Sequence, residues 1–389
     1  MRSVITRLAV AAMSLAASAV YAGAEMQGVT DDKILIGSIQ PLSGPVASWG
    51  VPTANGLRLA VDDINAAGGV HGRKIEIIIE DDQYDPRKTL QAADKLINLD
   101  KVFVLVHSFG TAQNMALKPI AEDAGMPLVF PSTGEPKVWE PTSDLFWGFY
   151  FPNRNQGRLM MRYLVKDKGY SKIGVIYQDD DLGKSYLEGI HAEAEALGVK
   201  TVDELGIPRN LIDTSSQVSR LKAAGAEAII VATVIPPAVS IAKEKAKLNW
   251  NVDLFLTQAA YSDTFVDLAG DAAQGVHAVS QVQIPYPEVS PEVAAWNDRY
   301  QKKYGQKADL GALYGYQAML MFRFGLENAG RDLTHQTLAD GLEKMKDYTD
   351  LFQTVPYTLS AEDHLVAHGV YFYQVEGSRW KRISDYFPL

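Results

Sequence analysis

Three loops in the first 134 residues of this 389-residue chain combine small and hydroxyl residues, with at most one aromatic residue each, directly after short apolar segments. In open α/β sheets, ligands bind beyond the carboxyl ends of the strands, where loops lead into helix N-termini and backbone N–H groups can hold an anion. Each loop alone is also compatible with ordinary turn chemistry. Together they predict an anion site. The loops are 41–45 followed by Trp49, 107–111, and 131–134.

Signatures of the common catalytic mechanisms are missing. The sequence has no G-x-S-x-G elbow, no H-E-x-x-H pair and no G-x-G-x-x-G turn. Gly183-Lys184-Ser185 resembles the end of a phosphate-binding loop, but Gln178 stands where that motif requires glycine. We therefore expect neither an enzyme nor a cofactor.

Acidic and histidine pairs give only weak metal signals. The runs 80–82 and 179–181 follow expected strands, where carboxylates could bind a divalent cation, but such runs more often cap helices and face solvent. His364 and His368 lie four apart in a loop-like stretch. We expect no metal site, while Asp181 is a candidate to reach a ligand amine.

Composition narrows the class of partner. The chain is 47% hydrophobic and 22% charged, and its length suits two or three domains. The absence of cysteine removes Zn-thiolate sites, Fe–S clusters, thiol nucleophiles and a lipid-anchored cysteine. Lys and Arg total 37 against 47 acids, so the charge disfavours nucleic acid and anionic membrane surfaces.

The first 24 residues have the pattern of an export signal. Arg2 and Arg7 precede an apolar run over 8–20, and Ala22-Gly23-Ala24 supplies the small residues of a cleavage site. A membrane anchor is the alternative, but the run is shorter than the ~20 residues that span a bilayer. We expect a soluble exported protein, cleaved near Ala24.

The remaining chain alternates short apolar runs with amphipathic stretches, which is typical of parallel sheets with crossover helices. The rhythm restarts after the loop 132–142 and becomes mostly helical past Pro285. We therefore predict an α/β fold with two doubly wound units in tandem. The expected strands are 34–39, 74–80, 102–106, 128–130, 172–177, 199–205, 228–233, 253–256, 275–282 and 370–375. The expected helices include 86–99, 153–168, 291–304, 310–328 and 334–348, and an aromatic, mixed-charge tail ends the chain.

Several motifs resemble the leucine/isoleucine/valine-binding-protein family, the periplasmic solute receptors of ABC importers. They are Ile36-Gly37, Pro41-Leu42-Ser43-Gly44-Pro45, Asn55-Gly56, the stretch 63–73, Asp81-Asp82 before Asp85-Pro86, and the stretches 123–128, 156–157 and 270–275. The resemblance spans essentially the whole chain after the signal. It implies a type I periplasmic-binding fold, with two lobes joined by three crossovers and a cleft between them. Lobe 1 would comprise 33–150 and 284–354, and lobe 2 would comprise 151–283 and 355–389.

The resemblance also implies how the first lobe binds a ligand. Gly110, Thr111, Ser132 and Thr133 match the positions that hold a carboxylate in the family, and Trp49 matches an aromatic residue that packs on the ligand. Such a cradle is physically sensible, because a buried carboxylate needs several charge-assisted hydrogen bonds to offset its lost hydration.

The second lobe departs from the amino-acid-binding pattern. The segment 234–237 contains Ile235 and Pro236 where amino-acid receptors offer a tyrosine, and 257–261 contains Ala259 and Tyr261 where they place an acid for the ligand ammonium. A buried ammonium without a carboxylate partner is costly. With Phe109 and Tyr150 at the cleft edge, the sequence favours an aromatic or apolar carboxylate, while branched-chain amino or keto acids stay open.

We thus expect a monomeric periplasmic receptor that closes over a small organic acid and delivers it to a membrane permease. Two other functions stay open. A ligand-sensing partner of a signalling receptor would use the same fold, and a hydrolase would need a nucleophile and a base that converge in the cleft.

Overall fold

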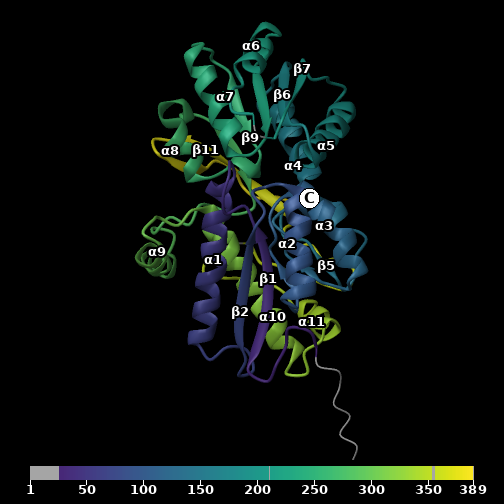
Figure 1. The fold of residues 1–389 in the computed structure, drawn as a ribbon. Helices are drawn as coiled ribbons and strands as arrows, with labels where there is room; N and C mark the ends of the chain where they lie inside the picture. The colour runs from purple at the N-terminus through teal and green to yellow at the C-terminus, as the bar shows by residue number, and fades with distance from the viewer. Residues whose placement is uncertain (1–25, 210, 353–354, 389) are drawn as a thin grey trace, which may run out of the picture.

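The computed structural model describes residues 26–209, 211–352 and 355–388, and it folds into two α/β lobes stacked end to end (Figure 1). The export signal lies outside the described residues. In the part of the chain that is described, no helix is both long and apolar enough to cross a membrane.

The first lobe is built on a five-stranded parallel sheet in the order β2-β1-β3-β4-β5. Apart from β1 and β2 its strands are two residues long, shorter than predicted, although backbone hydrogen bonds from Phe103 to Leu35 and from Phe109 to Ile39 continue the pairing on either side of 105–106. The strands are β1 (Lys33–Gln40), β2 (Lys74–Asp81), β3 (Leu105–Val106), β4 (Leu128–Val129) and β5 (Phe146–Trp147).

Helices from distant parts of the chain cover this sheet. The predicted helical region past Pro285 joins the first lobe, and α10 packs along α1 so closely that a Cβ on Gly56 would lie 2.1 Å from the Ala312 carbonyl oxygen. Glycine is therefore needed at that crossing. The helices are α1 (Ala47–Ala66), α2 (Pro86–Asp94), α3 (Thr111–Asp123), α9 (Pro291–Tyr304), α10 (Leu310–Ala329) and α11 (His335–Leu342).

The second lobe repeats the plan and then adds antiparallel strands. Its sheet has the order β12-β11-β10-β9-β8-β6-β7, and β13 pairs with β11. The chain end predicted as a tail thus forms two further strands, β12 and β13, which both pair with β11. The strands are β6 (Ile173–Gln178), β7 (Asp203–Ile207), β8 (Ala228–Ala232), β9 (Asp253–Leu256), β10 (His277–Ser280), β11 (Gly369–Glu376), β12 (Arg379–Arg382) and β13 (Phe387–Pro388).

The helices of the second lobe lie on both faces of that sheet (Figure 1). They are α4 (Asn153–Arg162), α5 (Asp181–Leu197), α6 (Ser215–Ala223), α7 (Ile235–Lys247) and α8 (Asp263–Ala269). Short 3₁₀ or π segments complete the fold, and two of them extend α2 and α4 close to their predicted ends. These segments are η1 (Lys95–Leu99), η2 (Pro136–Val138), η3 (Tyr163–Asp167), η4 (Gln258–Ala260) and η5 (Gly270–Ala273).

The chain crosses between the lobes after β5, after β10 and before β11. The third crossing comes later than the predicted boundary at 354. The Val366 N–H donates to the Gly148 carbonyl at 3.2 Å, and the His364 ring stacks on Trp147 with centroids 3.6 Å apart. These contacts hold the segment before β11 on the first lobe. The other boundaries stay predictions.

Candidate functional site

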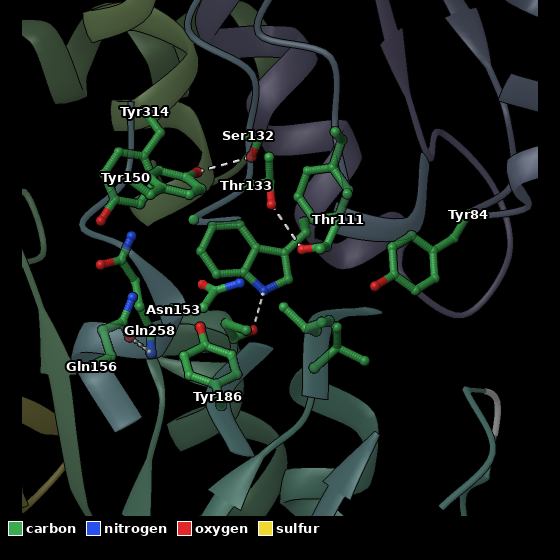
Figure 2. A pocket seen from close by; sticks show the side chains of 17 residues that line it. Tyr84, Thr111, Ser132, Thr133, Tyr150, Asn153, Gln156, Tyr186, Gln258 and Tyr314 are labelled. Carbon is green, nitrogen blue, oxygen red and sulfur yellow. Dashed lines mark hydrogen bonds between the residues drawn. The ribbon is translucent and has the colours of Figure 1, made fainter. Parts of the chain in front are cut away.

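A pocket lies between the lobes, where the carboxyl ends of strands from both sheets face each other (Figure 2). It contains about 480 Å³ of empty space, part of it continuous with solvent. This is the position that the strand-end rule predicts for a ligand. The lining residues are Trp49, Tyr84, Phe109, Gly110, Thr111, Ser132, Thr133, Gly134, Tyr150, Asn153, Gln156, Leu182, Tyr186, Val234, Gln258, Ala259 and Tyr314.

The first lobe supplies a wall of hydroxyl groups. The Thr111 and Thr133 hydroxyls are 2.8 Å apart, and the Ser132 hydroxyl lies 2.9 Å from the Tyr150 hydroxyl. Gly110, at φ +97°, leads into α3, whose first backbone N–H groups have no partner within the helix. Each hydroxyl pair keeps donor or acceptor capacity to spare. These groups can therefore serve as a preformed cradle for an anion.

The second lobe supplies amide groups. Asn153 and Gln258 are 2% and 3% exposed, yet the Asn153 Nδ2 and the Gln258 Nε2 have no hydrogen-bond partner in the described part of the protein. By contrast, the Gln156 Nε2 donates to the Phe151 carbonyl at 2.9 Å. A buried N–H without an acceptor costs about 1–3 kcal/mol, so the two free amides favour a ligand that brings acceptors.

None of the seventeen described lining residues carries a charged side chain. Burial raises the pKa of the Tyr84, Tyr150, Tyr186 and Tyr314 hydroxyls, which keeps them neutral and able to donate. Behind the wall, burial lowers the pKa of His107 to about 4, so its imidazole is also neutral. The pocket can neutralise an anion by hydrogen bonds, but it offers no carboxylate to an ammonium.

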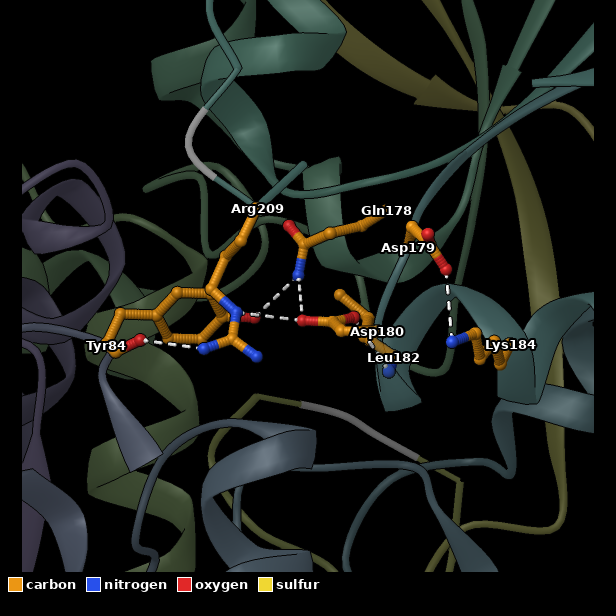
Figure 3. A network of polar contacts seen from close by, with 7 residues as sticks. All are labelled: Tyr84, Gln178, Asp179, Asp180, Leu182, Lys184 and Arg209. Carbon is orange, nitrogen blue, oxygen red and sulfur yellow. Dashed lines mark hydrogen bonds and ion pairs between the residues drawn. The ribbon is translucent and has the colours of Figure 1, made fainter. Parts of the chain in front are cut away.

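Direct contacts join the two lobes around this pocket. The Trp49 Nε1 donates to the Ala259 carbonyl at 3.0 Å. Near Tyr84 the Arg209 guanidinium lies 5.3 Å from the ring centroid, donates to the Tyr84 carbonyl at 3.4 Å and pairs with Asp180 at 2.9 Å (Figure 3). The Gln178 Nε2 donates to the Tyr84 hydroxyl at 3.3 Å. The structure is thus a closed arrangement of the lobes.

The structure brings eight of the twelve residues expected at the site into the pocket lining. Asp181 is exposed at the start of α5, and Ile235 and Pro236 open α7 behind Val234. Tyr261 is buried against Tyr373, with ring centroids 4.7 Å apart. These four residues lie outside the lining, and the ligand-contacting set stays a prediction. The eight in the lining are Trp49, Phe109, Gly110, Thr111, Ser132, Thr133, Tyr150 and Ala259.

Sequence reasoning missed the other lining residues as ligand contacts. Two of them could have been found from the sequence. Gln258 directly precedes the expected site residue Ala259, and Asn153 is the first residue of the helix that follows the first crossing between the lobes. Nothing in the sequence around Tyr314 indicates that it lines the pocket, because only the packing of α10 against α1 brings it near the strand-end loops. The full set missed is Tyr84, Gly134, Asn153, Gln156, Leu182, Tyr186, Val234, Gln258 and Tyr314.

The two histidines considered for a metal do not converge. His364 is buried against Trp147, whereas the His368 Nε2 lies 3.4 Å from Asp363. Across the described residues, no group of three or more His, Asp or Glu side chains is placed to hold a metal ion.

Comparison with known proteins gives consistent matches. The profile of a family described as periplasmic binding protein matches residues 33–379. A Leucine-, isoleucine-, valine-, threonine-, and alanine-binding protein of Pseudomonas aeruginosa is 25% identical over 320 residues, which cover 82% of this chain and 83% of that protein.

Two solved structures share the fold. A fatty acid ABC transporter substrate-binding protein from Thermomonospora curvata has a TM-score of 0.83 and 24% identity, covering 93% of this chain and 94% of that one. An ABC transporter solute-binding protein from R. palustris in complex with benzoate has a TM-score of 0.80 and 20% identity, covering 90% and 95%.

Proposed function

Since this chain belongs to the periplasmic binding protein family, with the features of its leucine/isoleucine/valine-binding proteins, we propose that it captures a small organic carboxylate and delivers it to the permease of an ABC importer. The observation that carries the proposal is a closed pocket whose described lining residues supply hydroxyl and amide donors but no charged side chain. Such a pocket suits a carboxylate and penalises an ammonium.

Lobe closure supplies the mechanism. The anion docks on the hydroxyl wall of the first lobe, which is already formed. Closure then brings the amide of Gln258 onto the ligand and makes the bond between the Trp49 indole and Ala259. The free energy of these added contacts sets the closed population that a permease would recognise.

Aromatic lining favours a flat or apolar acid. Six of the described lining residues are aromatic, and the side chains of Trp49 and Tyr314 lie nearly parallel, with an interplanar angle of 15° and centroids 6.5 Å apart. A benzoate-like body would replace water against these rings. The R. palustris complex supports this choice to the extent that the same fold holds benzoate there.

A branched-chain amino acid is the second candidate. It is supported by the name of the Pseudomonas aeruginosa relative, which lists leucine, isoleucine and valine among its ligands. It is opposed by the absence of an acidic side chain among the described lining residues.

Export to the periplasm and a monomeric state complete the proposal. Residues 1–24 would direct export, and the family is periplasmic. The family consists of binding proteins, which agrees with the expectation that this chain is not an enzyme.

A thermal-shift screen followed by calorimetry tests the proposal. At equal concentration, benzoate, phenylacetate and 4-methyl-2-oxopentanoate should raise the melting temperature more than leucine or valine, because the proposal expects these acids to bind more tightly. A ligand at a hundred times its Kd stabilises the folded protein by about 2.7 kcal/mol. Larger shifts with the amino acids would overturn the carboxylate proposal in favour of the second candidate.

A further inference from the structure

Gln258 presents a buried hydrogen-bond donor with no acceptor. Its Nε2 has no partner in the described part of the protein, although its other polar atoms are engaged. The backbone N–H donates to the Gln156 Oε1 at 3.2 Å, and the side-chain Oε1 accepts from the backbone N–H of Gln281 at 3.4 Å. The side chain lines the pocket, together with Asn153 and Gln156, on the side away from Tyr84 (Figure 2).

The orientation of this amide follows from its neighbours. The Gln281 backbone N–H can only donate, so it requires the oxygen of Gln258, and turning the amide over would set two donors against each other. Gln281 is itself fixed: its Oε1 accepts from the Phe151 N–H at 2.8 Å, and its Nε2 donates to the Phe149 carbonyl at 3.3 Å. The free donor of Gln258 is therefore held in place before a ligand arrives.

The ligand carboxylate has other partners on the opposite wall. The hydroxyls of Thr111, Ser132 and Thr133 lie there, and Asn153 adjoins them because its backbone N–H donates to the Gly134 carbonyl at 2.7 Å. On the second lobe, the neighbouring Ala259 carbonyl accepts from the Trp49 indole, and the Gln258 Nε2 has no acceptor in the described part of the protein. The Gln258 donor is thus left for a different part of the ligand.

We propose that Gln258 is a specificity-determining residue that donates to a second, uncharged oxygen of the ligand. The ligand class is then a small carboxylic acid that also carries an oxo, hydroxyl or ether oxygen. An ammonium at that place would set one donor against another, because it has no lone pair to accept. This inference rests on the proposed function and narrows its ligand class.

Matched ligands test the inference by calorimetry. One series shares a carbon skeleton and differs only at C2: 4-methylpentanoate, 4-methyl-2-oxopentanoate and leucine. The other compares benzoate with 4-hydroxybenzoate. In the wild-type protein, the oxygen-bearing acid of at least one series should bind about tenfold more tightly than its unsubstituted partner. Gln258→Leu should bring that ratio close to one, while Gln301→Leu on the exposed face of α9 should leave it unchanged.

The outcomes separate the inference from the proposed function. If the unsubstituted acids bind and a second oxygen adds nothing in either series, or if Gln258→Leu keeps the ratio, the proposed function stands and this inference is wrong. If none of the acids binds, both are wrong. Should Gln258→Leu fail to fold, Gln258→Glu retains an oxygen for the Gln281 N–H but removes the donor. It should then weaken binding of the oxygen-bearing acid more than that of its partner.

Discussion

The two walls of the pocket come from the same topology but differ in chemistry. The strand order β2-β1-β3-β4-β5 of the first lobe corresponds to β7-β6-β8-β9-β10 in the second, and in both lobes loops at the strand ends line the pocket. The first wall carries hydroxyls that already bond to one another. The second wall carries the free amide of Gln258, and the free amide of Asn153 lies beside the first wall, because the Asn153 backbone N–H donates to the Gly134 carbonyl. Topology thus places both walls, whereas their side chains give them different roles. We call the first wall the anchor, because it is the wall proposed to bind the carboxylate, and the second wall the selector, because its amide is proposed to distinguish between ligands.

This difference also orders the binding steps. A wall whose hydroxyls are held at 2.8 and 2.9 Å needs little rearrangement, so it can bind an anion in the open form. A wall with unsatisfied buried donors gains free energy only when closure brings acceptors to it. Affinity should therefore depend most on the first wall, and selectivity on the second.

Removal of the first-wall hydroxyls should have the largest effect. In the double variant Thr111→Val, Ser132→Ala, benzoate affinity should fall about a hundredfold or more, because each hydrogen bond to a charged group contributes about 1.5–3 kcal/mol. Calorimetry measures the loss. The control Ser216→Ala, Ser219→Ala changes exposed positions of α6 and should bind normally. Equal affinity in the two double variants would show that the anchor lies elsewhere.

Trp49→Phe should have the next largest effect. It keeps an aromatic ring but removes the 3.0 Å bond from the indole to the Ala259 carbonyl, a contact between the lobes. The dissociation rate should rise by about three- to tenfold with little change in the association rate, since the bond forms on closure. Stopped-flow fluorescence with the remaining tryptophans would measure both rates. A slower association with an unchanged dissociation rate would contradict the role in closure.

Arg209→Gln tests the contact at Tyr84 with a smaller expected effect. Its ion pair with Asp180 anchors the guanidinium over the Tyr84 ring, so its loss should raise the radius of gyration of the free protein and weaken benzoate binding about threefold. Lys184→Gln is the matched control, because it also removes an ion pair near the start of α5. The Lys184 partner, Asp179, lies on the same lobe, and this ion pair does not include Tyr84 (Figure 3). Small-angle scattering that gives identical radii for both variants would exclude the Arg209 contact as a determinant of closure.

The smallest effect concerns a half-buried acid pair between the lobes, Asp263 and Asp309. Asp309, which caps α10, accepts the backbone N–H groups of Asp263 and Thr264 at the start of α8. Burial, followed by the charge of Asp309, raises the pKa of Asp263 to about 7. Because this folded value lies above the unfolded one, the contribution of Asp263 to stability is complete below pH ~4 and is lost as the pH rises through about 7.

Asp263→Asn should remove that pH dependence. The amide stays neutral and can still accept from the Tyr286 hydroxyl, which lies 2.8 Å from Asp263 Oδ1. The variant should melt about 2 °C or more above the wild-type protein at pH 8 and close to it at pH 4. Scanning calorimetry over this range provides the measurement, and a variant less stable at pH 8 would contradict the assignment.

Much of the fold could be predicted from local patterns. The strand 253–256 and the helix 291–304 match the structure at both ends, since the helix begins after a capping Ser290 and ends at Gly305. The third crossing could not be placed, because it depends on pairing of Val366 with Gly148 across a long stretch of chain. The hydroxyl wall of the site follows from strand-end loops. Tyr314 does not, since long-range helix packing brings it there.

A crystal structure of the protein with 4-hydroxybenzoate or 4-methyl-2-oxopentanoate would test the central claim most directly. The account predicts that the carboxylate lies within hydrogen-bond distance of the Thr111 and Ser132 hydroxyls, with the ligand body against the rings and no charged side chain touching it. A carboxylate bound instead by a lysine or arginine, or one turned toward the second lobe, would contradict the assignment of anchor and selector.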